Sequence, residues 1–571
     1  MRKTLSVVLV ILFVFPFTAF AKDLSTTASF KALKMDKYPQ NLLETLVIQA
    51  EVGKVFLNEY ENAAKPEMSP EDKKKGYGLF IRNYLFDVSA FSSPSKNEFE
   101  KKEIKILASL GEYEPVVFSV YPLEALKKCA ITLSDFLNGK GGKLPGEAFQ
   151  INNVIHRPIG NDNVVVKGEL LLKTKEIEHI EAGVNKTVWI NVLIPENAQA
   201  GVYKGKLTFS PAGKPGTEIP VEIKVLPFKL KQPPDISWAP IMAGSFDLEE
   251  LEKELLAIKE HGMTGEVTGC LMPKAAREGE VPGDFSYANK YMELAKKIGL
   301  PGRFVLHGLM ITGTSRLDSN YCFAGRGAEI YTQKTYTLLK ETVQGVKANA
   351  EKNKWLPYVI YLSSELGSSS QNPVDFNTVM KGAESFYAAA REVPGVKLLA
   401  TFNRQEELAL HAGLPALDET GFNGEMYPGW EKAAKQKPSW MTFVEIDQRL
   451  GYGLYLWKFN LKGARPWCLK PGIMYPREQG LLYYINKEML PSVRFERIRE
   501  GVDDYKYMYT LSELIKEAKA KGKDAKTAEE VVRQITEKIP HDHKSPTKSF
   551  AYENLDDYRR QIGEEILKLL N

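Results

Sequence analysis

Hydrophobic and polar positions follow a strand-like pattern from about residue 101 to residue 232. Apolar residues alternate there with polar or small ones in short runs separated by Gly and Pro, as at Ile104, Ile106 and Ala108. A period of two is typical of strands with one buried face, and short strands at this spacing predict a β-sandwich. The expected strands are 104–108, 116–120, 164–173, 187–194, 202–209 and 219–226.

A linker-like stretch, Lys231–Pro234, precedes a region in which apolar runs alternate with helical periodicity. Helices are expected near 251–258, 285–298, 330–350 and 374–391. Eight strand–helix steps over about 250 residues match the size of a (β/α)8 TIM-like barrel, predicted here for residues 235–490. Its expected strands are Ile236–Met242, Gly265–Cys270, Phe304–His307, Val359–Leu362, Lys397–Asn403, Gly421–Met426, Trp440–Ile446 and Leu454–Trp457.

Both ends of the chain differ from these two regions. Residues 491–571 have helical periodicity and predict a C-terminal helical segment. Acidic and basic residues alternate in its first part and predict ion pairs that dock a helix under the barrel; they are Arg494, Arg497, Arg499, Glu500, Asp503 and Asp504. Residues 22–100 have no clear assignment, with helical periodicity at Leu42–Tyr60; part of the sandwich domain is the alternative.

The first 21 residues have the features of a secretory signal peptide. Arg2 and Lys3 precede the apolar run Leu5–Phe20, and Ala19-Phe20-Ala21 is a small-residue cleavage site, so the mature chain is expected to start at Lys22. The run is short for a membrane span, which disfavours an uncleaved anchor. A secreted or periplasmic protein is therefore expected, with no membrane association after cleavage.

Composition narrows the function classes. The 571 residues are 43% hydrophobic and 26% charged, with a net charge of +4, which gives no reason to expect a nucleic-acid partner. The four cysteines, Cys129, Cys270, Cys322 and Cys468, are far apart and predict neither a disulfide framework nor a zinc site. His541-Asp542-His543 has no further ligand nearby and is read as a solvated turn. No cofactor is implied, and the oligomeric state stays open.

Glu365 is the first candidate for chemistry. It follows the β-favouring run Val359–Leu362 through Ser363 and Ser364, and Leu366 and Gly367 come next. A Glu at the carboxyl end of a parallel strand stands where barrel enzymes keep their catalytic groups. A carboxylate in a solvated loop or at a helix start is the alternative.

Three motifs carry a family resemblance. They are Gly111–Pro115, the stretch from Ala182-Gly183 through Trp189 and Pro195 to Gly205, and Pro491–Tyr507. Together they resemble the secreted family 123 glycoside hydrolases and their uncharacterised relatives, over most of residues 100–515. The resemblance implies an N-terminal β-sandwich and a catalytic barrel.

The same resemblance implies a mechanism. Characterised members remove N-acetylgalactosamine, with the substrate acetamido group as nucleophile and an adjacent Asp-Glu pair at the end of a strand. Glu365 matches that Glu, the acid/base, whereas Ser364 stands in the place of the Asp. A hydroxyl cannot supply the negative charge that stabilises a developing oxazolinium ion. The reaction class carries over, but the 2-acetamido substrate does not follow.

Without acetamido assistance, a second carboxylate is needed. Glu445, at the end of the expected seventh strand, is the candidate, and a surface role is its alternative; Glu425 and Asp447 are further candidates. A separation from Glu365 of about 5–5.5 Å would indicate a nucleophile, and about 6.5–9.5 Å an inverting base.

Aromatic and polar residues near strand ends are candidates for sugar binding, because an aromatic ring can stack on the apolar face of a sugar. The resemblance assigns Trp457 to substrate. The other candidates for substrate binding are Ser364, Tyr427, Trp430, His307 and Asn403. The sequence therefore predicts a glycoside hydrolase acting on a carbohydrate substrate. The alternative is a non-hydrolytic carbohydrate-binding protein on a decayed glycosidase scaffold, which Ser364 favours.

Overall fold

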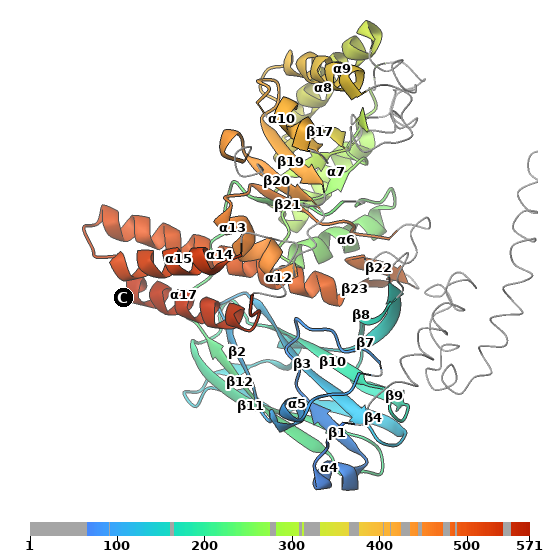
Figure 1. Ribbon diagram of the computed structural model, residues 1–571, viewed down its shortest axis with the longest axis vertical. Helices are drawn as coiled ribbons and strands as arrows, with labels where there is room; N and C mark the ends of the chain where they lie inside the picture. The colour runs from blue at the N-terminus through green and yellow to red at the C-terminus, as the bar shows by residue number, and fades with distance from the viewer. Residues whose placement is uncertain are drawn as a thin grey trace, which may run out of the picture. The chain divides into compact units, whose positions relative to one another are not determined.

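The computed structural model consists of two compact units (Figure 1), one formed by the chain up to Leu230 together with Pro471–Glu496 and the other by Lys231–Lys470 with Arg497–Asn571. The first division falls beside the predicted linker. Residues 471–496, expected in the barrel and the helical segment, belong instead to the first unit. The structure describes residues 66–90, 92–159, 165–241, 243–273, 281, 283–307, 311–312, 332–364, 376–402, 405–411, 413–423, 434–442, 448–471, 480–485, 488–540 and 550–571.

The first unit contains two large sheets of mainly antiparallel strands and a small one in which β22 (Leu482–Ile485) pairs with β23 (Glu488–Pro491). One large sheet has the order β1-β3-β10-β7-β8, and the other runs β2-β12-β11-β4-β9, with β5 paired to β11 and β6 paired to β5. The strands are β1 (Tyr77–Phe80), β2 (Ile104–Ala108), β3 (Tyr113–Pro122), β4 (Leu126–Leu133), β5 (Phe136–Leu137), β6 (Lys143–Leu144), β7 (Phe149–Ile159), β8 (Val165–Lys173), β9 (Glu176–Ile180), β10 (Lys186–Leu193), β11 (Gly201–Ser210) and β12 (Thr217–Val225).

A single hydrophobic cluster joins the two large sheets of this unit. Val188 and Ile190 of β10 belong to it together with Leu207 and Phe209 of β11. Each of the six strands expected from the alternating pattern overlaps an observed one. Strand β1 pairs with β3, so the described part of the unassigned N-terminal region, which also contains α4 (Pro70–Lys75) and α5 (Lys96–Glu100), contributes to the same unit. The helical periodicity at Leu42–Tyr60 lies outside the described residues.

The second unit is built on a parallel sheet in which the strands follow one another almost in chain order, β13-β21-β20-β19-β18-β17-β15-β14, with β16 (Ile311–Thr312) beside β17. At the ends of this order, the Val267 N–H donates to the Pro240 carbonyl, with 2.9 Å between N and O. The strands are β13 (Ser237–Trp238), β14 (Val267–Thr268), β15 (Phe304–Leu306), β17 (Tyr358–Ser364), β18 (Leu398–Phe402), β19 (Glu419–Asn423), β20 (Ser439–Thr442) and β21 (Gly463–Arg465).

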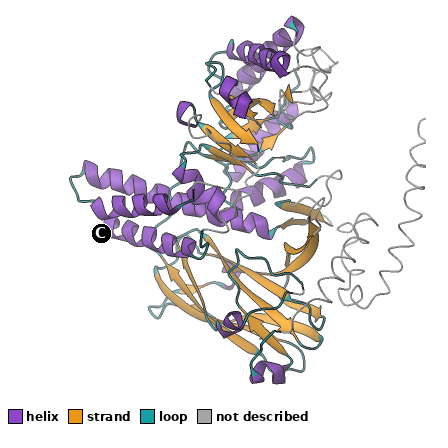
Figure 2. Cartoon of the chain, viewed as in Figure 1, coloured by secondary structure: helices purple, strands orange, loops and turns teal. Residues whose placement is uncertain are grey.

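Helices separate these strands, as Figure 2 shows in purple against orange, and the mixed α/β class is confirmed. Asp247 begins α6, because its carboxylate accepts hydrogen bonds from the backbone of Glu249 and Glu250. The helices are α6 (Leu248–Glu260), α7 (Ser286–Ile298), α8 (Gln333–Lys352), α9 (Phe376–Arg391) and α10 (Gln405–His411), and the C-terminal ones are α14 (Val493–Ala520), α15 (Lys526–Lys538) and α17 (Asn554–Leu570).

The predicted eighth strand is wrong. Leu454–Trp457 lies in a helical segment made of α12 (Gln448–Leu450), the π-turn η5 (Gly451–Tyr455) and α13 (Leu456–Lys458), and the strand is β21, a few residues later. Leu454, Tyr455 and Leu456 are all buried, and a short apolar run buried on every side has the same pattern in a helix as in a strand. Gly453 fits here because a Cβ would lie 2.5 Å from the Gly501 carbonyl oxygen of α14.

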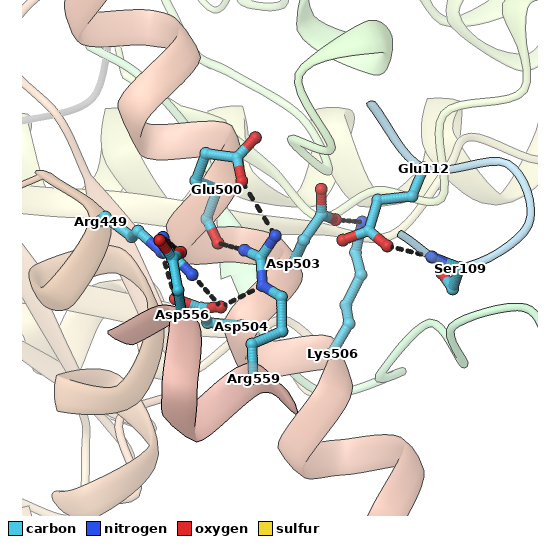
Figure 3. A network of polar contacts seen from close by, with 9 residues as sticks. All are labelled: Ser109, Glu112, Arg449, Glu500, Asp503, Asp504, Lys506, Asp556 and Arg559. Atoms are coloured by element: carbon cyan, nitrogen blue, oxygen red, sulfur yellow. Dashed lines mark hydrogen bonds and ion pairs between the residues drawn. The ribbon is translucent and has the colours of Figure 1, made fainter. Parts of the chain in front are cut away.

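A buried network of charged residues joins three helical segments of the second unit (Figure 3). Asp504 of α14 accepts from Arg449 Nε at 2.7 Å and from Arg559 Nε at 2.6 Å, and Arg559 Nη1 donates to Glu500 at 2.9 Å. Ion pairs that dock a helix were expected for these acids. For Glu500 and Asp504 the partners are Arg449 of α12 and Arg559 of α17, which a helix pattern alone does not name.

Candidate active site

The carboxyl ends of the parallel strands β13 to β21 define one edge of the sheet, called here the carboxyl edge; the opposite side is the amino edge. Strand β17 reaches the carboxyl edge at Ser364, which pairs in register with Thr312 of β16. The next residue is Glu365. Most of the predicted chemistry falls outside the described residues, namely Glu365, Glu445, Tyr427, Trp430 and Asn403, with the further candidates Glu425 and Asp447.

Polar groups gather inside the sheet close to the carboxyl edge. Tyr361 is buried with Val305, Val359 and Leu399 in one cluster, and its hydroxyl lies 2.5 Å from Thr401 Oγ1 of β18. The guanidinium carbon of Arg465 lies 4.5 Å from the centre of the Tyr361 ring. Tyr361 is therefore the point at which three strands present polar groups.

Arg465 is not among the residues that the sequence predicts for this site. It is the last residue of β21 and is fully buried, in register with Thr442 of β20. Because the eighth strand was expected at Leu454–Trp457, Arg465 was not expected at the end of a strand. A lone Arg in the stretch Gly463-Ala464-Arg465-Pro466 becomes conspicuous only when that stretch is recognised as a strand. Burying a guanidinium costs free energy unless it interacts with opposite charge or polar partners. A buried arginine at the carboxyl edge is therefore a candidate functional residue.

His307 lies at the carboxyl edge as expected from its place after β15. Its backbone N–H donates to the Thr268 carbonyl at 3.0 Å, and its ring centre lies 5.9 Å from that of Tyr361. The structure thus brings His307, Tyr361 and Arg465 together, with Ser364 at the end of the same strand as Tyr361.

Trp457 is placed differently. It belongs to α13, and its ring packs edge-on against Tyr505 of α14 with 5.4 Å between centres. The chain then enters β21 at Gly463, so Trp457 precedes the amino end of that strand, and its location does not support a contact with substrate at the carboxyl edge. The resemblance to a strand that ends in Trp does not hold, because the tryptophan closes a helix here.

The amino edge contains an ion pair of its own. Arg303, just before β15, pairs with Glu419, the first residue of β19, and its guanidinium lies 5.4 Å from the Trp440 ring centre. Trp440 Nε1 donates to the other Glu419 oxygen at 2.5 Å. Both carboxylate oxygens therefore have a donor.

Within the described ranges no group of three or more His, Cys, Asp or Glu could hold a metal ion, and no helix there is long and apolar enough to cross a membrane.

Comparison with known proteins gives one strong likeness. No family model and no curated protein match the chain. Among solved structures, a family 123 glycoside hydrolase from Clostridium perfringens, studied for glycolipid glycan hydrolysis, has a TM-score of 0.65 at 12% identity, covering 87% of this chain and 100% of that one. A family 39 glycoside hydrolase from Bacteroides cellulosilyticus has a TM-score of 0.32 at 10% identity, covering 66% and 80%. The resemblance to family 123 is confirmed, at the level of the fold.

Proposed function

We propose that the protein hydrolyses a glycosidic bond in a glycan or polysaccharide, with Glu365 as general acid/base. The observation that carries the proposal is strand β17, which ends at Ser364 and so delivers Glu365 to the carboxyl edge of a sheet whose fold resembles a family 123 glycoside hydrolase. The proposal includes a full (β/α)8 barrel, supported by the Val267–Pro240 hydrogen bond, and an N-terminal β-sandwich, supported by the shared hydrophobic cluster.

In the proposed first step, the Glu365 carboxyl group gives its proton to the glycosidic oxygen as the bond from that oxygen to the anomeric carbon breaks, and the leaving group departs as an alcohol. A general acid must hold its proton near neutral pH, which an apolar surrounding favours. The rings of Tyr361 and His307, near the end of the same strand and of β15, would supply part of that surrounding.

A second carboxylate must stay ionised to act as nucleophile or as base towards water, and we assign this role to Glu445. It follows Thr442, the last residue of β20, by three positions, and Thr442 pairs in register with Arg465. A neighbouring cation favours the ionised form of a carboxylate. Arg465 would thus separate the roles of the two acids. Ser364, in place of the Asp that a 2-acetamido sugar requires, favours this two-carboxylate mechanism and a different substrate.

The test is hydrolysis of a panel of aryl glycosides and polysaccharides by the mature protein and by Glu365→Gln. Glu384→Gln, an exposed glutamate on α9, serves as the matched control. Loss of the proton donor is expected to lower the rate by about 100-fold or more, whereas the control keeps its rate. Equal activity of Glu365→Gln and the parent protein would remove Glu365 from catalysis.

A second candidate function is carbohydrate binding without hydrolysis, for which the hydroxyl of Ser364 at a carboxylate position is the specific observation. Glycan binding without turnover in both the parent and Glu365→Gln would favour it. The substrate or ligand is a carbohydrate in either case. The N-terminal signal supports a secreted or periplasmic location, which secretion of the full-length chain into the periplasm or medium would test.

A further inference from the structure

The loop Gly244–Asp247 follows β13 at the carboxyl edge. Hydrogen bonds hold its backbone, and its last residue caps a helix. The Gly244 N–H donates to the Glu254 carboxylate, and Lys470 Nζ donates to the Gly244 carbonyl at 3.1 Å. Tyr287 of α7 donates its hydroxyl to the Ser245 carbonyl. Asp247 then caps α6. The backbone on each side of Phe246 is therefore fixed by side chains from several other segments.

The acid and base that hold Gly244 form a buried ion pair. Glu254 is fully buried, and Lys470 Nζ lies 2.6 Å from its Oε2 and 3.1 Å from Oε1 of Glu250. Glu266, also buried, accepts from Tyr291, and burial followed by the nearby Glu254 charge raises the pKa of Glu266. Buried ion pairs add little net stability, but they can fix one geometry.

Gly244 has no room for a side chain. Its φ is +94°, and a Cβ would lie 2.4 Å from Thr268 Oγ1, at the end of β14. The preceding segment runs beside the chain that leaves β21: Ile241 N–H donates to Pro466 at 3.0 Å and Leu469 N–H donates to Ile241 at 2.7 Å. The loop thus leaves the sheet next to Arg465, at the carboxyl edge.

Phe246 projects from this fixed loop into solvent. With 60% of its surface exposed, it is the most exposed large hydrophobic side chain of the described residues. Its ring centre lies 5.2 Å from that of Tyr287, with 51° between the planes. An aromatic ring left in water forgoes the free energy that burying its apolar surface would give. A ring on a restrained backbone also loses less conformational entropy on binding than a ring on a mobile loop.

We propose that Phe246 is a sugar-binding platform at the rim of the carboxyl edge, which stacks on a pyranose ring away from the cleaved bond, and that Glu254 and Lys470 are positioning residues for it. This inference rests on the proposed function. The apolar C–H face of a pyranose matches one aromatic face. Exposed Asp247, Leu248 and Glu249 follow the ring in sequence, and a protein partner would need about 800 Å² of surface on this side, far more than one ring and one leucine supply.

The test measures binding by affinity electrophoresis on gels that contain arabinoxylan, galactomannan or mixed-linkage β-glucan. The full-length mature chain carries Glu365→Gln throughout, so hydrolysis does not interfere. Adding Phe246→Ala is expected to weaken retention on the best-bound polysaccharide by about 10-fold, the value of one stacked ring at about 1.4 kcal/mol. Phe246→Tyr should retain binding, and Phe86→Ala, an exposed phenylalanine in the first unit, should leave it unchanged.

If Lys470 acts through Phe246, the effects of substituting the two residues on retention should not be additive. Lys470→Met should weaken retention about fivefold in the parent but have no further effect once Phe246 is Ala, and Lys470→Arg should restore binding. A purely structural role would weaken binding equally in both backgrounds. Equal retention of Phe246→Ala and its parent, or no retention of either on any gel, would overturn the inference. Lost binding to phosphatidylcholine vesicles with unchanged retention would assign the ring to a lipid surface instead. Hydrolysis of aryl glycosides by the protein with Glu365 intact tests the proposed function separately.

Discussion

The two edges of the parallel sheet each contain an arginine, half-buried Arg303 at one and fully buried Arg465 at the other, and the two differ in what surrounds them. At the amino edge, Arg303 pairs with Glu419, whose second oxygen accepts from Trp440. At the carboxyl edge, Arg465 lies over the ring of Tyr361, on a strand in register with the one that leads to Glu445. The first arrangement is complete within the sheet. The second places a positive charge where the loops after the strands meet, which is where barrel enzymes carry out their chemistry.

Replacing Arg465 should have the largest effect. Arg465→Met removes the charge that we propose keeps Glu445 ionised, so kcat/KM on the best aryl glycoside should fall about 1,000-fold. The acidic limb of its pH profile should also move to higher pH, because a carboxylate without a neighbouring cation ionises less readily. Activity within about threefold of the parent, with an unchanged pH profile, would contradict the assignment.

Replacing Arg303 should instead affect folding. Arg303→Met leaves the buried Glu419 carboxylate without its cation, which should lower the free energy of unfolding by about 3–4 kcal/mol. Denaturant unfolding measures this, and the protein that remains folded should keep its specific activity. A stable but inactive Arg303→Met would contradict the assignment of the amino edge to stability and the carboxyl edge to function.

Acid should weaken the structure behind the carboxyl edge. His411 of α10 packs against Phe402, the last residue of β18, and burial lowers the pKa of His411 to about 4. The unfolded chain then binds its proton near pH 6.5 while the folded protein does not, so stability is lost as the pH falls from about 6.5 towards 4, by up to about 2 kcal/mol. Unfolding free energies at pH 7 and 4.5 should differ less in His411→Gln than in the parent; an equal difference would exclude His411 as the cause.

The smallest effect is expected at Tyr361. Tyr361→Phe removes its hydrogen bond to Thr401 while keeping the ring beneath Arg465, so stability should fall by about 1 kcal/mol and kcat/KM by only a few-fold. Thr401→Val removes the same bond from the other side. The two variants together should cost about as much as either alone in a double-mutant cycle, and additive losses would show that the bond is unimportant.

The parallel sheet and its two edges also show how much of the fold the sequence could predict. Seven of the parallel strands overlap the ranges expected from apolar runs between helical patterns, and β17 is one of them. His307 lies at the edge where its position after a strand placed it. Glu365 and Glu445 stay predictions, because they lie outside the described residues. Several strands of the first unit were not expected, among them the longer ones β1, β4, β7 and β9. Strand β4 shows why: Lys127 and Lys128 near its start interrupt the apolar alternation in the sequence.

The sequence by itself determined what depends on neighbours along the chain: the helix and strand periods, the change of pattern at Lys231–Pro234, and the Glu that follows Val359–Leu362. Tertiary structure decided what depends on partners far away. It made Leu454–Trp457 a helix, put Arg465 at the end of the eighth strand and gave Asp504 its partners Arg449 and Arg559. Burial on all sides erases the periodicity that distinguishes helix from strand, and a charge does not name its counter-ion until the chain has folded.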